Sequence, residues 1–577
     1  MTGRQLLRRI TSHPDFLALV AVFFFAWLAA KPLFGSGYFN MHDDLQMMRQ
    51  LNMEKCFIDG QIPCRWIPDM GYGYGYPLFN FYPPLPYLTG QLFRIVGYSY
   101  ADTAKALFIV AFIASGVTMY YLAKRFFGRL GGVVSSIFYV WAPYHAVDVY
   151  VRGAMNESWG LIWFPLILLF AYNVLSLKSK KWVDYAPAVI GLSLSWFALM
   201  TSHNLMVIVF TPFFAVWCAI WLLYSRNWKS VLPLITGGAL AIGLSAFFSL
   251  PVLFEKNIVQ TDTLVRGYYE FTAHFPSLRQ LFISRFWGYG PSVWLENDEM
   301  SFQIGWFHWG IPLFVALILA VRTIKTKKFD AIFWAILGMG LTAAGAAFMD
   351  HPRSTPIWQQ FTALQFIQFP WRYLTMVILG TSFVAGGIAA LLKSVPRYLI
   401  VTFSIIAVVA YSWSFFLPQN GKLGPLTDEE KFTGAAWELQ QTAGIYDYLP
   451  ATAKTAPKAP RRTQADILEG KGVIEEGRSG TNWEEFKVVA ETPAIIRISV
   501  LDFPEWKVFV NGNEVEKFIP ETEEWGRIHI TVPKGDNKVT ARLYDTPVRT
   551  FGNILSLFSW VTLLVLSVYL YKKRETA

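Results

Sequence analysis

Long apolar segments alternate with short charged ones along most of the chain. Residues 16–33, 231–254 and 398–417 contain few or no charges, and each approaches the roughly 20 mostly apolar residues that a membrane-spanning helix needs. Soluble helices are rarely apolar on every side over such a length. The pattern therefore predicts a polytopic α-helical membrane protein.

Bounding each apolar segment at its flanking charged or turn-forming residues gives about twelve spans. They are 16–34, 102–123, 131–149, 157–177, 183–201, 204–224, 231–254, 303–321, 330–349, 371–392, 397–417 and 551–571. Residues 81–97 are also apolar, but Pro83, Pro84 and Pro86 break the start of a helix there. We interpret that segment as a juxtamembrane or re-entrant piece.

Lys and Arg gather in every second connection between these spans. The clusters are Arg4/Arg8/Arg9, Lys124/Arg125/Arg129, Lys178/Lys180/Lys181, Arg226/Lys229, Arg322/Lys325/Lys327/Lys328, Lys393/Arg397 and Lys572/Lys573/Arg574. Cytoplasmic loops are enriched in Lys and Arg, so we expect a cell-membrane protein with both termini in the cytoplasm. The first cluster and span could also form a signal peptide cleaved near Ala29–Ala30, but the long apolar run favours a retained anchor.

The outer face then holds loops 35–101, 148–157, 255–302 and 350–370, and a region at 418–550 that differs in character. Thr427-Asp428-Glu429-Glu430 is a capping-box pattern that should start a helix. Strands are predicted at 494–501, 506–510, 514–519, 527–532 and 538–544, with a hairpin turn at Asn511-Gly512. We predict three parts: a transmembrane domain (1–417), an extracytoplasmic β-sandwich-like domain (418–550) and a last span with a basic tail (551–577).

The composition agrees with a lipid environment and bears on which classes of partner and metal site are expected. Hydrophobic residues make up 54% of the chain and charged residues 16%, below the usual quarter for soluble domains. The net charge of +10 resides in the loop clusters, so nucleic acid is not an expected partner. Cys218 lies in a span, whereas Cys56 and Cys64 share one loop and could be a disulfide or two thiols. The chain has no CxxC, HxH or HExxH pattern, so a structural zinc site is not expected.

Two adjacent acids, Asp43 and Asp44, follow the first span. Asp44 could cap a helix over residues 45–57. One cap does not explain the pair, because consecutive helical residues point about 100° apart. A carboxylate beside a low-dielectric wall can serve as a general base or bind a cation. We therefore expect at least one of the two to be functional.

Further polar and aromatic groups are expected at the same depth. Glycines and tyrosines at 71–76, ending in Tyr76, could stack on sugars or form an interfacial aromatic belt. The others lie at span mouths, and each alone could be a snorkelling or capping residue: His42, Asp148, Arg152, Glu157, His203, Trp371 and Arg372. Together they predict one outer vestibule, where paired arginines would suit a phosphate.

Several of these segments resemble a known family. HDDLQMMRQL and RWIPDMGYGYGYPLFNFYPPLPYL, with the later VYVRGAMNE, SHN, FPWRYL and YDYLP, resemble bacterial membrane proteins labelled 6-pyruvoyl-tetrahydropterin synthase-related. The stretches DFPEWKVFVNGNEV and PKGDNKVTARLYDTPVR resemble the outer domain of YfhO-type membrane proteins. The pterin label implies no mechanism, because the soluble zinc enzyme needs a histidine cluster that this chain lacks.

These families in turn resemble the GT-C glycosyltransferase superfamily. That resemblance implies a GT-C-like fold and sugar transfer from a polyprenyl-phosphate donor outside the cytoplasm. It places the catalytic acid of the first outer loop on Asp43, with Asp44 close behind. Glu157 or Asp148 would correspond to the additional acids of other GT-C lineages.

The resulting hypothesis is transfer of a sugar to a cell-envelope glycan or glycolipid. Asp43 or Asp44 would be the base, and Arg152 and Arg372 would hold the lipid phosphate. His42, Tyr76, Asp148, Glu157, His203 and Trp371 would contribute to substrate binding. A divalent cation (Mg²⁺ or Mn²⁺) is compatible with these acids, but no ligand set is defined. The alternatives are a glycolipid transporter or flippase, and a non-catalytic envelope assembly protein that binds sugar.

Overall fold

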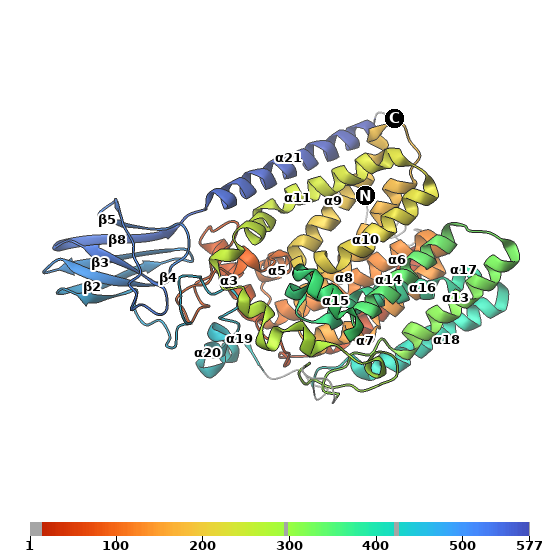
Figure 1. Cartoon of the computed structure of the whole chain (residues 1–577), viewed down its shortest axis with the longest axis horizontal. Helices are drawn as coiled ribbons and strands as arrows, with labels where there is room; N and C mark the ends of the chain where they lie inside the picture. Colours follow the sequence, from red (N-terminus) through yellow and green to blue (C-terminus); the bar gives the residue numbers. More distant parts are fainter. Residues whose placement is uncertain (1–13, 293–297, 420–425, 576–577) are drawn as a thin grey trace.

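The computed structural model describes residues 14–292, 298–419 and 426–575. The basic cluster expected at Arg4, Arg8 and Arg9 lies outside these residues. Among the described residues, eleven helices are long and apolar enough to cross a membrane, and the chain is a multi-pass membrane protein. Figure 1 shows these helices packed into one bundle, with a β-sandwich projecting from one end. We call this the sandwich end of the bundle.

Most of the predicted spans correspond to one helix each. The spanning elements are α2 (Phe16–Ala30), α6 (Tyr100–Val140), α8 (Met155–Ser176), α9 (Trp182–Ser202), α10 (Asn204–Ser225), α11 (Val231–Phe254), α13 (Trp306–Thr326), α14 (Ala331–Met349), α16 (Leu374–Gly386) with α17 (Ile388–Leu391), α18 (Ser394–Ser412) and α21 (Pro547–Glu575). The apolar faces of these helices form a continuous core that includes Phe112, Leu168 and Phe383.

Helix α6 contains two predicted spans, 102–123 and 131–149. Gly128 has φ 72°, a left-handed conformation that glycine adopts without steric cost, and it interrupts the helix. The Ser136 hydroxyl donates to the Gly116 carbonyl oxygen at 2.8 Å, so the two halves fold back against each other. The second span was predicted to reach 149 but ends at Val140. Pro143, which cannot continue a helix, starts the short α7 (Pro143–Ala146), and a π-helical turn (Val147–Val151) follows.

The apolar segment 81–97 does not cross the bundle, as predicted. It forms the end of α4 (Leu78–Phe81) and then α5 (Leu85–Ile95). The 11 residues of α5 extend only about 16 Å, roughly half of a hydrocarbon core. The loop 35–101 also contains α3 (Gln46–Ile58).

The predicted β-sandwich is confirmed. One sheet has the order β1-β4-β7 and the other β2-β3-β8-β5-β6, and every pairing is antiparallel. The strands are β1 (Ala465–Glu469), β2 (Gly472–Ser479), β3 (Trp483–Ala490), β4 (Ala494–Leu501), β5 (Trp506–Val510), β6 (Asn513–Val515), β7 (Arg527–Val532) and β8 (Gly535–Leu543). Strands β1 to β3 were not predicted, and β6 is shorter than expected. Asn511 and Gly512 form the expected hairpin turn, with φ 51° and 86°.

Polar side chains fix the sandwich to the bundle. Arg549, fully buried at the start of α21, contacts Glu255 at the end of α11 at 2.9 Å and lies over the Phe503 ring of the β-domain, 4.7 Å from its centroid. In the first loop, Arg65 contacts Asp545 at 3.2 Å. The short helices α19 (Asp428–Lys431), which begins with the predicted Thr427 capping box, and α20 (Gly434–Thr442) lie between sandwich and bundle (Figure 1).

Cys56 and Cys64 form a disulfide, which decides between the two alternatives left by the sequence. The closed loop packs against the sandwich. The Asp59 carboxylate accepts hydrogen bonds from the Thr481 amide at 2.7 Å and from the Trp483 indole at 3.0 Å. The first loop is thus held at two places, by the bundle and by the β-domain.

Candidate functional site

The residues after the first span run beside the connection between α7 and α8. The His42 amide donates to the Val151 carbonyl oxygen at 3.1 Å, and the Asp43 amide donates to that of Arg152 at 2.8 Å. Gly153, with φ 60°, follows directly, and a Cβ there would lie 2.1 Å from the Met41 sulfur. A glycine is therefore required for this close approach. The backbone alone places Asp43 beside the Arg152 segment.

Asp43 is oriented by a buried arginine. Its Oδ2 lies 2.8 Å from Arg49 Nη1 and accepts a second hydrogen bond from Gln46 Nε2 at 3.1 Å. Arg49 also stacks on the Tyr82 ring, 4.2 Å from the ring centroid. The Arg49 side chain is 7% exposed and that of Asp43 is 35% exposed. The carboxylate is therefore held in place while it stays open to an incoming hydroxyl group.

Asp44 has different partners. Its carboxylate pairs with Lys431 of α19, and its carbonyl oxygen accepts from Gln440 of α20 at 2.8 Å. Burial raises the pKa of Asp44, although the Lys431 charge opposes the shift. The interpretation of Asp44 as a helix cap is wrong, because the N-cap of α3 is Leu45 and no side chain caps it. Asp44 instead connects the first loop to the segment before the β-domain.

A buried ionic cluster lies on the other side of Asp43. Arg152 Nη1 contacts Asp148 Oδ1 at 2.5 Å and Glu157 Oε2 at 2.9 Å. Arg372 Nε lies 3.3 Å from the same Glu157 oxygen. The Tyr144 hydroxyl donates to the other one, Oε1, at 2.6 Å. Glu157, in the first turn of α8, is thus the hub between two arginines from separate elements.

Aromatic rings form one wall of this cluster. The Arg152 guanidinium lies 4.4 Å from the centroid of Trp371, which stacks on Phe369 at 4.8 Å. Arg372 donates from Nη1 to the Ile367 carbonyl oxygen at 2.7 Å. Arg152 makes all its polar side-chain contacts through Nη1, so among the described residues its Nη2 has no partner. That nitrogen remains able to donate to a ligand.

The two predicted histidines lie at the margins of the cluster. His203, between α9 and α10, is 9% exposed and close enough to Arg372 and Glu157 to interact with their charges. His42 donates from its ring to the Tyr289 carbonyl oxygen at 2.9 Å. The structure thus brings Asp148, Arg152, Glu157, His203, Trp371 and Arg372 together, with His42 and Asp43 alongside.

Tyr76 is placed differently from these residues. It is fully buried, its hydroxyl donates to the Gly444 carbonyl oxygen at 2.9 Å, and the Tyr448 amide donates to it at 2.6 Å. Tyr74 lies edge-on to Trp525 of the β-domain. These tyrosines fill the junction between the first loop and the following domain. A substrate contact by Tyr76 stays a prediction and would require this junction to open.

Sequence reasoning missed Arg49 and Asp447. Asp447, in the YDYLP segment, interacts electrostatically with Arg49 and Asp43. Burial raises the pKa of Asp447 to about 6, against the opposing charge of Arg49. Among the described residues its carboxylate forms no ion pair. The YDYLP motif was one of the segments that resemble a known family, so it could have drawn attention to Asp447. Nothing near it in the sequence indicates, however, that Asp447 faces the first loop.

No three His, Cys, Asp or Glu side chains come together as a metal site within the described part of the chain. The divalent cation considered from the sequence therefore has no assigned ligand set. Asp43 and Asp44, the expected candidates, use their carboxylates for Arg49 and Lys431.

Comparison with known proteins gives distant likenesses. No protein-family model matches the chain. An uncharacterized protein of Lactococcus lactis subsp. cremoris (strain MG1363) is 22% identical over 334 residues, which cover 55% of this chain and 51% of that protein. The chain thus spans about half the length of the curated relative it matches.

Among solved structures, the chain is similar to three membrane proteins. The Archaeoglobus fulgidus oligosaccharyltransferase has a TM-score of 0.44 at 11% identity, covering 78% of this chain and 61% of that one. Mycobacterial arabinofuranosyltransferase AftD has a TM-score of 0.42 at 13% identity, and the match covers 71% of this chain and 27% of that one. Cupriavidus metallidurans ArnT, bound to undecaprenyl phosphate, has a TM-score of 0.38 at 13% identity, and the match covers 68% of this chain and 63% of that one. All three TM-scores are below 0.5, so the site itself must carry any argument about function.

Proposed function

We propose that this protein is a membrane glycosyltransferase of the GT-C type. It transfers a sugar from a polyprenyl-phosphate donor to a cell-envelope glycan or glycolipid, at the sandwich end of the bundle. The observation that carries this proposal is the position of Asp43: an open carboxylate, oriented by a buried arginine, whose own backbone is bonded to the segment of the Arg152 cluster.

Asp43 would act as the general base. Its Oδ1 has no protein partner among the described residues, whereas Arg49 and Gln46 hold Oδ2. An acceptor hydroxyl would donate its proton to Asp43 while its oxygen attacks the anomeric carbon of the donor. The bond between that carbon and the phosphate oxygen breaks, and the polyprenyl phosphate leaves with the electron pair. A positioned base of this kind contributes about 10²–10⁴ in rate.

The arginine cluster would receive the leaving phosphate. Two arginines face two acids there, so the formal charges of Arg152, Arg372, Asp148 and Glu157 cancel. The unpartnered Arg152 Nη2 would donate to a phosphate oxygen, and its stacking on Trp371 holds the guanidinium plane in place. A donor fixed where negative charge develops stabilises the transition state.

Two independent features support an extracytoplasmic location of this end. The Cys56–Cys64 disulfide lies in the first loop, and disulfides persist mainly in oxidising compartments. The basic clusters at 178–181 and 322–328 lie in connections after α8 and α13, at the opposite ends of the helices from the site.

The experiment is lipidomics and glycan mass spectrometry in a deletion strain. The strain should accumulate a lipid-linked sugar and lack one envelope glycan, and the wild-type gene should reverse both. Asp43→Asn should fail to reverse them at equal membrane abundance, whereas Asp44→Asn should succeed. Full complementation by Asp43→Asn would reject the base assignment. A reporter inserted after Phe39 and active on the cytoplasmic side would reject the location.

A further inference from the structure

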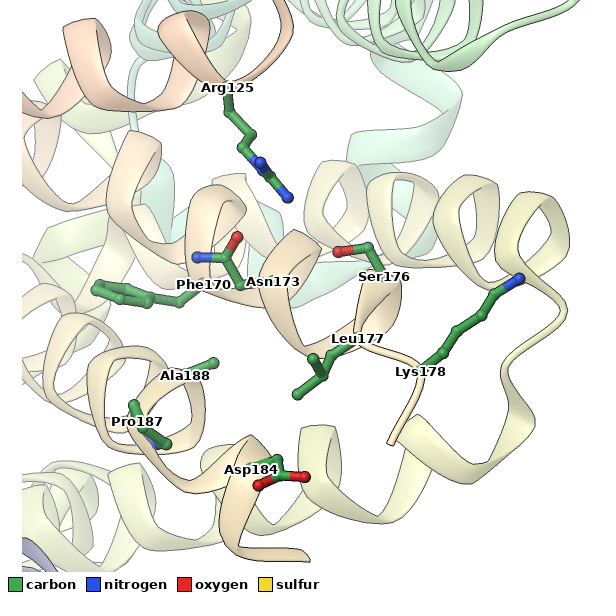
Figure 2. A pocket seen from close by; sticks show the side chains of 9 residues that line it. All are labelled: Arg125, Phe170, Asn173, Ser176, Leu177, Lys178, Asp184, Pro187 and Ala188. Carbon is green, nitrogen blue, oxygen red and sulfur yellow. The ribbon is translucent and has the colours of Figure 1, made fainter. Parts of the chain in front are cut away.

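A cavity lies at the opposite end of α8 from Glu157. It has a volume of about 400 Å³ and lies between the internal turn of α6, the end of α8 and the start of α9 (Figure 2). One side of its lining is polar and includes Arg125, Asn173 and Ser176. The other side is apolar and includes Phe170 and Pro187. The cavity is thus amphiphilic.

Three polar side chains of this cavity, those of Arg125, Asn173 and Ser176, make no hydrogen bond to the described part of the protein. Among the described residues, the side chains of Asn173 and Ser176 form no hydrogen bond, and Arg125 makes only a ring contact with Tyr172, 5.4 Å from its centroid. Figure 2 shows the Arg125 guanidinium and the Ser176 hydroxyl directed toward the same space, with the Asn173 amide beside it, its oxygen toward Arg125 and its nitrogen toward Phe170. Two donor groups without a hydrogen-bond partner among the described residues therefore face one space.

The frame of the cavity is fixed. The Leu177 carbonyl oxygen, at the end of α8, accepts from the Tyr185 hydroxyl at 2.8 Å and from Asn227 Nδ2 at 2.7 Å. Asp184, also in the lining, accepts a hydrogen bond from the Ser179 hydroxyl. Arg125 and Lys178 outnumber this one carboxylate, so the lining is cationic.

We propose that this cavity binds the phosphate headgroup of an anionic membrane lipid. A guanidinium offers a phosphate two parallel hydrogen bonds, and the Ser176 hydroxyl adds a further donor. The apolar side of the lining and the position at the ends of three spans suit a ligand whose phosphate is attached to acyl chains. Basic pockets between spans are where such headgroups bind. This site is separate from the proposed transferase centre and does not depend on it.

The test is lipid binding by the full chain in nanodiscs, measured by native mass spectrometry after titration with phosphatidylglycerol or phosphatidylcholine. We expect preferential retention of phosphatidylglycerol. Arg125→Gln should weaken it about five-fold, the effect of roughly 1 kcal/mol for one basic contact. Ser176→Asp, which brings a negative charge to the same point, should weaken it at least as much.

Lys180→Gln is the matched control, because Lys180 is exposed in the same connection but does not line the cavity. It should retain the lipid like the wild type. Three results would overturn the proposal: equal retention of both lipids, unchanged retention in Arg125→Gln and Ser176→Asp, or an equal loss in Lys180→Gln. Thermal stabilisation by inorganic phosphate that matches that by phosphatidylglycerol would assign the site to free phosphate instead.

Discussion

The Asp43 amide donates to the Arg152 carbonyl oxygen at 2.8 Å. Together with the bond from the His42 amide to the Val151 carbonyl oxygen, this backbone bond joins the two halves of the candidate site, because Asp43 belongs to the first loop and Arg152 to the connection before α8. The spacing between the proposed base and the proposed phosphate site is therefore set by main-chain geometry rather than by flexible side chains. Substitutions of either side chain should change the chemistry and leave this spacing intact.

Asp43→Asn should reduce sugar transfer by about 10²–10⁴-fold, because an amide cannot accept the hydroxyl proton. The substitution also leaves the Arg49 side chain, which is 7% exposed, without its carboxylate partner, so we expect a loss of about 1–3 kcal/mol in the free energy of unfolding beside the loss of turnover. The measurement is turnover in membranes complemented with each variant, scaled to protein abundance. Asp43→Glu is the matched variant and should recover part of the rate. Asp43→Asn with wild-type turnover would contradict the assignment.

Arg49→Gln tests the orientation of the base separately. The Asp43 carboxylate would remain but would lose its 2.8 Å partner. We expect a smaller loss of turnover than in Asp43→Asn, because the base is still present but is no longer held in one orientation. Arg49→Lys keeps a positive charge beside Asp43 and should lose less turnover than Arg49→Gln. The readout is turnover scaled to protein abundance, with the unfolding temperature of each variant measured in parallel.

Asp44 and Lys431 should be coupled in stability rather than in catalysis. The Lys431 side chain is 5% exposed, so Asp44→Asn would leave a buried ammonium unpaired. We expect a loss of about 1–3 kcal/mol in the free energy of unfolding. Lys431→Met alone should also destabilise, but the double variant should recover part of the loss. Additive effects in this cycle, measured by unfolding in detergent, would show that the pair does not interact.

Much of the fold could be predicted because long apolar segments need no tertiary information to be recognised as spans. The hairpin of α6 was also predicted, as two spans separated by the Arg125–Arg129 cluster. Strands β2 and β3 were not, because a solvated β-sheet face such as Gly472–Ser479 reads as a charged loop. Their pairing with each other and with β8, all in the five-stranded sheet, is not visible in the local pattern.

Part of the candidate site could be predicted because the spans themselves could be recognised from the sequence. Once the spans are assigned, their outer ends must lie at a similar depth in the membrane. This alone predicts that Arg152, Glu157 and Arg372, which all lie at such ends, are near one another. The different partners of Asp43 and Asp44 were not predictable, since that of Asp44 is Lys431, 387 residues away along the chain. Asp447 was missed because only tertiary packing brings it near Arg49.

Asp447 should make stability depend on pH. Its pKa is raised from 3.8 to about 6 by burial, so the folded state binds its proton more tightly than the unfolded state does. The contribution of this one group to stability is then highest below about pH 4 and is lost as the pH rises through 6, because ionisation of Asp447 is costlier in the folded chain. Asp447→Asn removes this loss.

The variant should therefore be more stable than the wild type at pH 7.5, by roughly 1–3 kcal/mol, and equal to it near pH 4. Thermal unfolding of both proteins across this range measures the difference. Glu429→Gln, at an exposed position of α19, is the control and should show no such trend. A difference between Asp447→Asn and wild type that does not vary with pH would contradict the proposed cause.

Reduction of the Cys56–Cys64 disulfide should loosen the β-domain from the bundle. The bond closes a loop with a sequence separation of 8, and restraining such a loop is worth about 2–3 kcal/mol. The loop carries Asp59, whose carboxylate binds Thr481 and Trp483. Dithiothreitol should therefore lower the unfolding temperature and increase proteolysis between residues 443 and 465, which join α20 to β1. Asp59→Asn should increase proteolysis without any reductant, since it weakens the same contact, whereas Cys218→Ser should change neither quantity. If reduction lowers the unfolding temperature but leaves proteolysis unchanged, the disulfide stabilises the first loop alone and does not fix the domain.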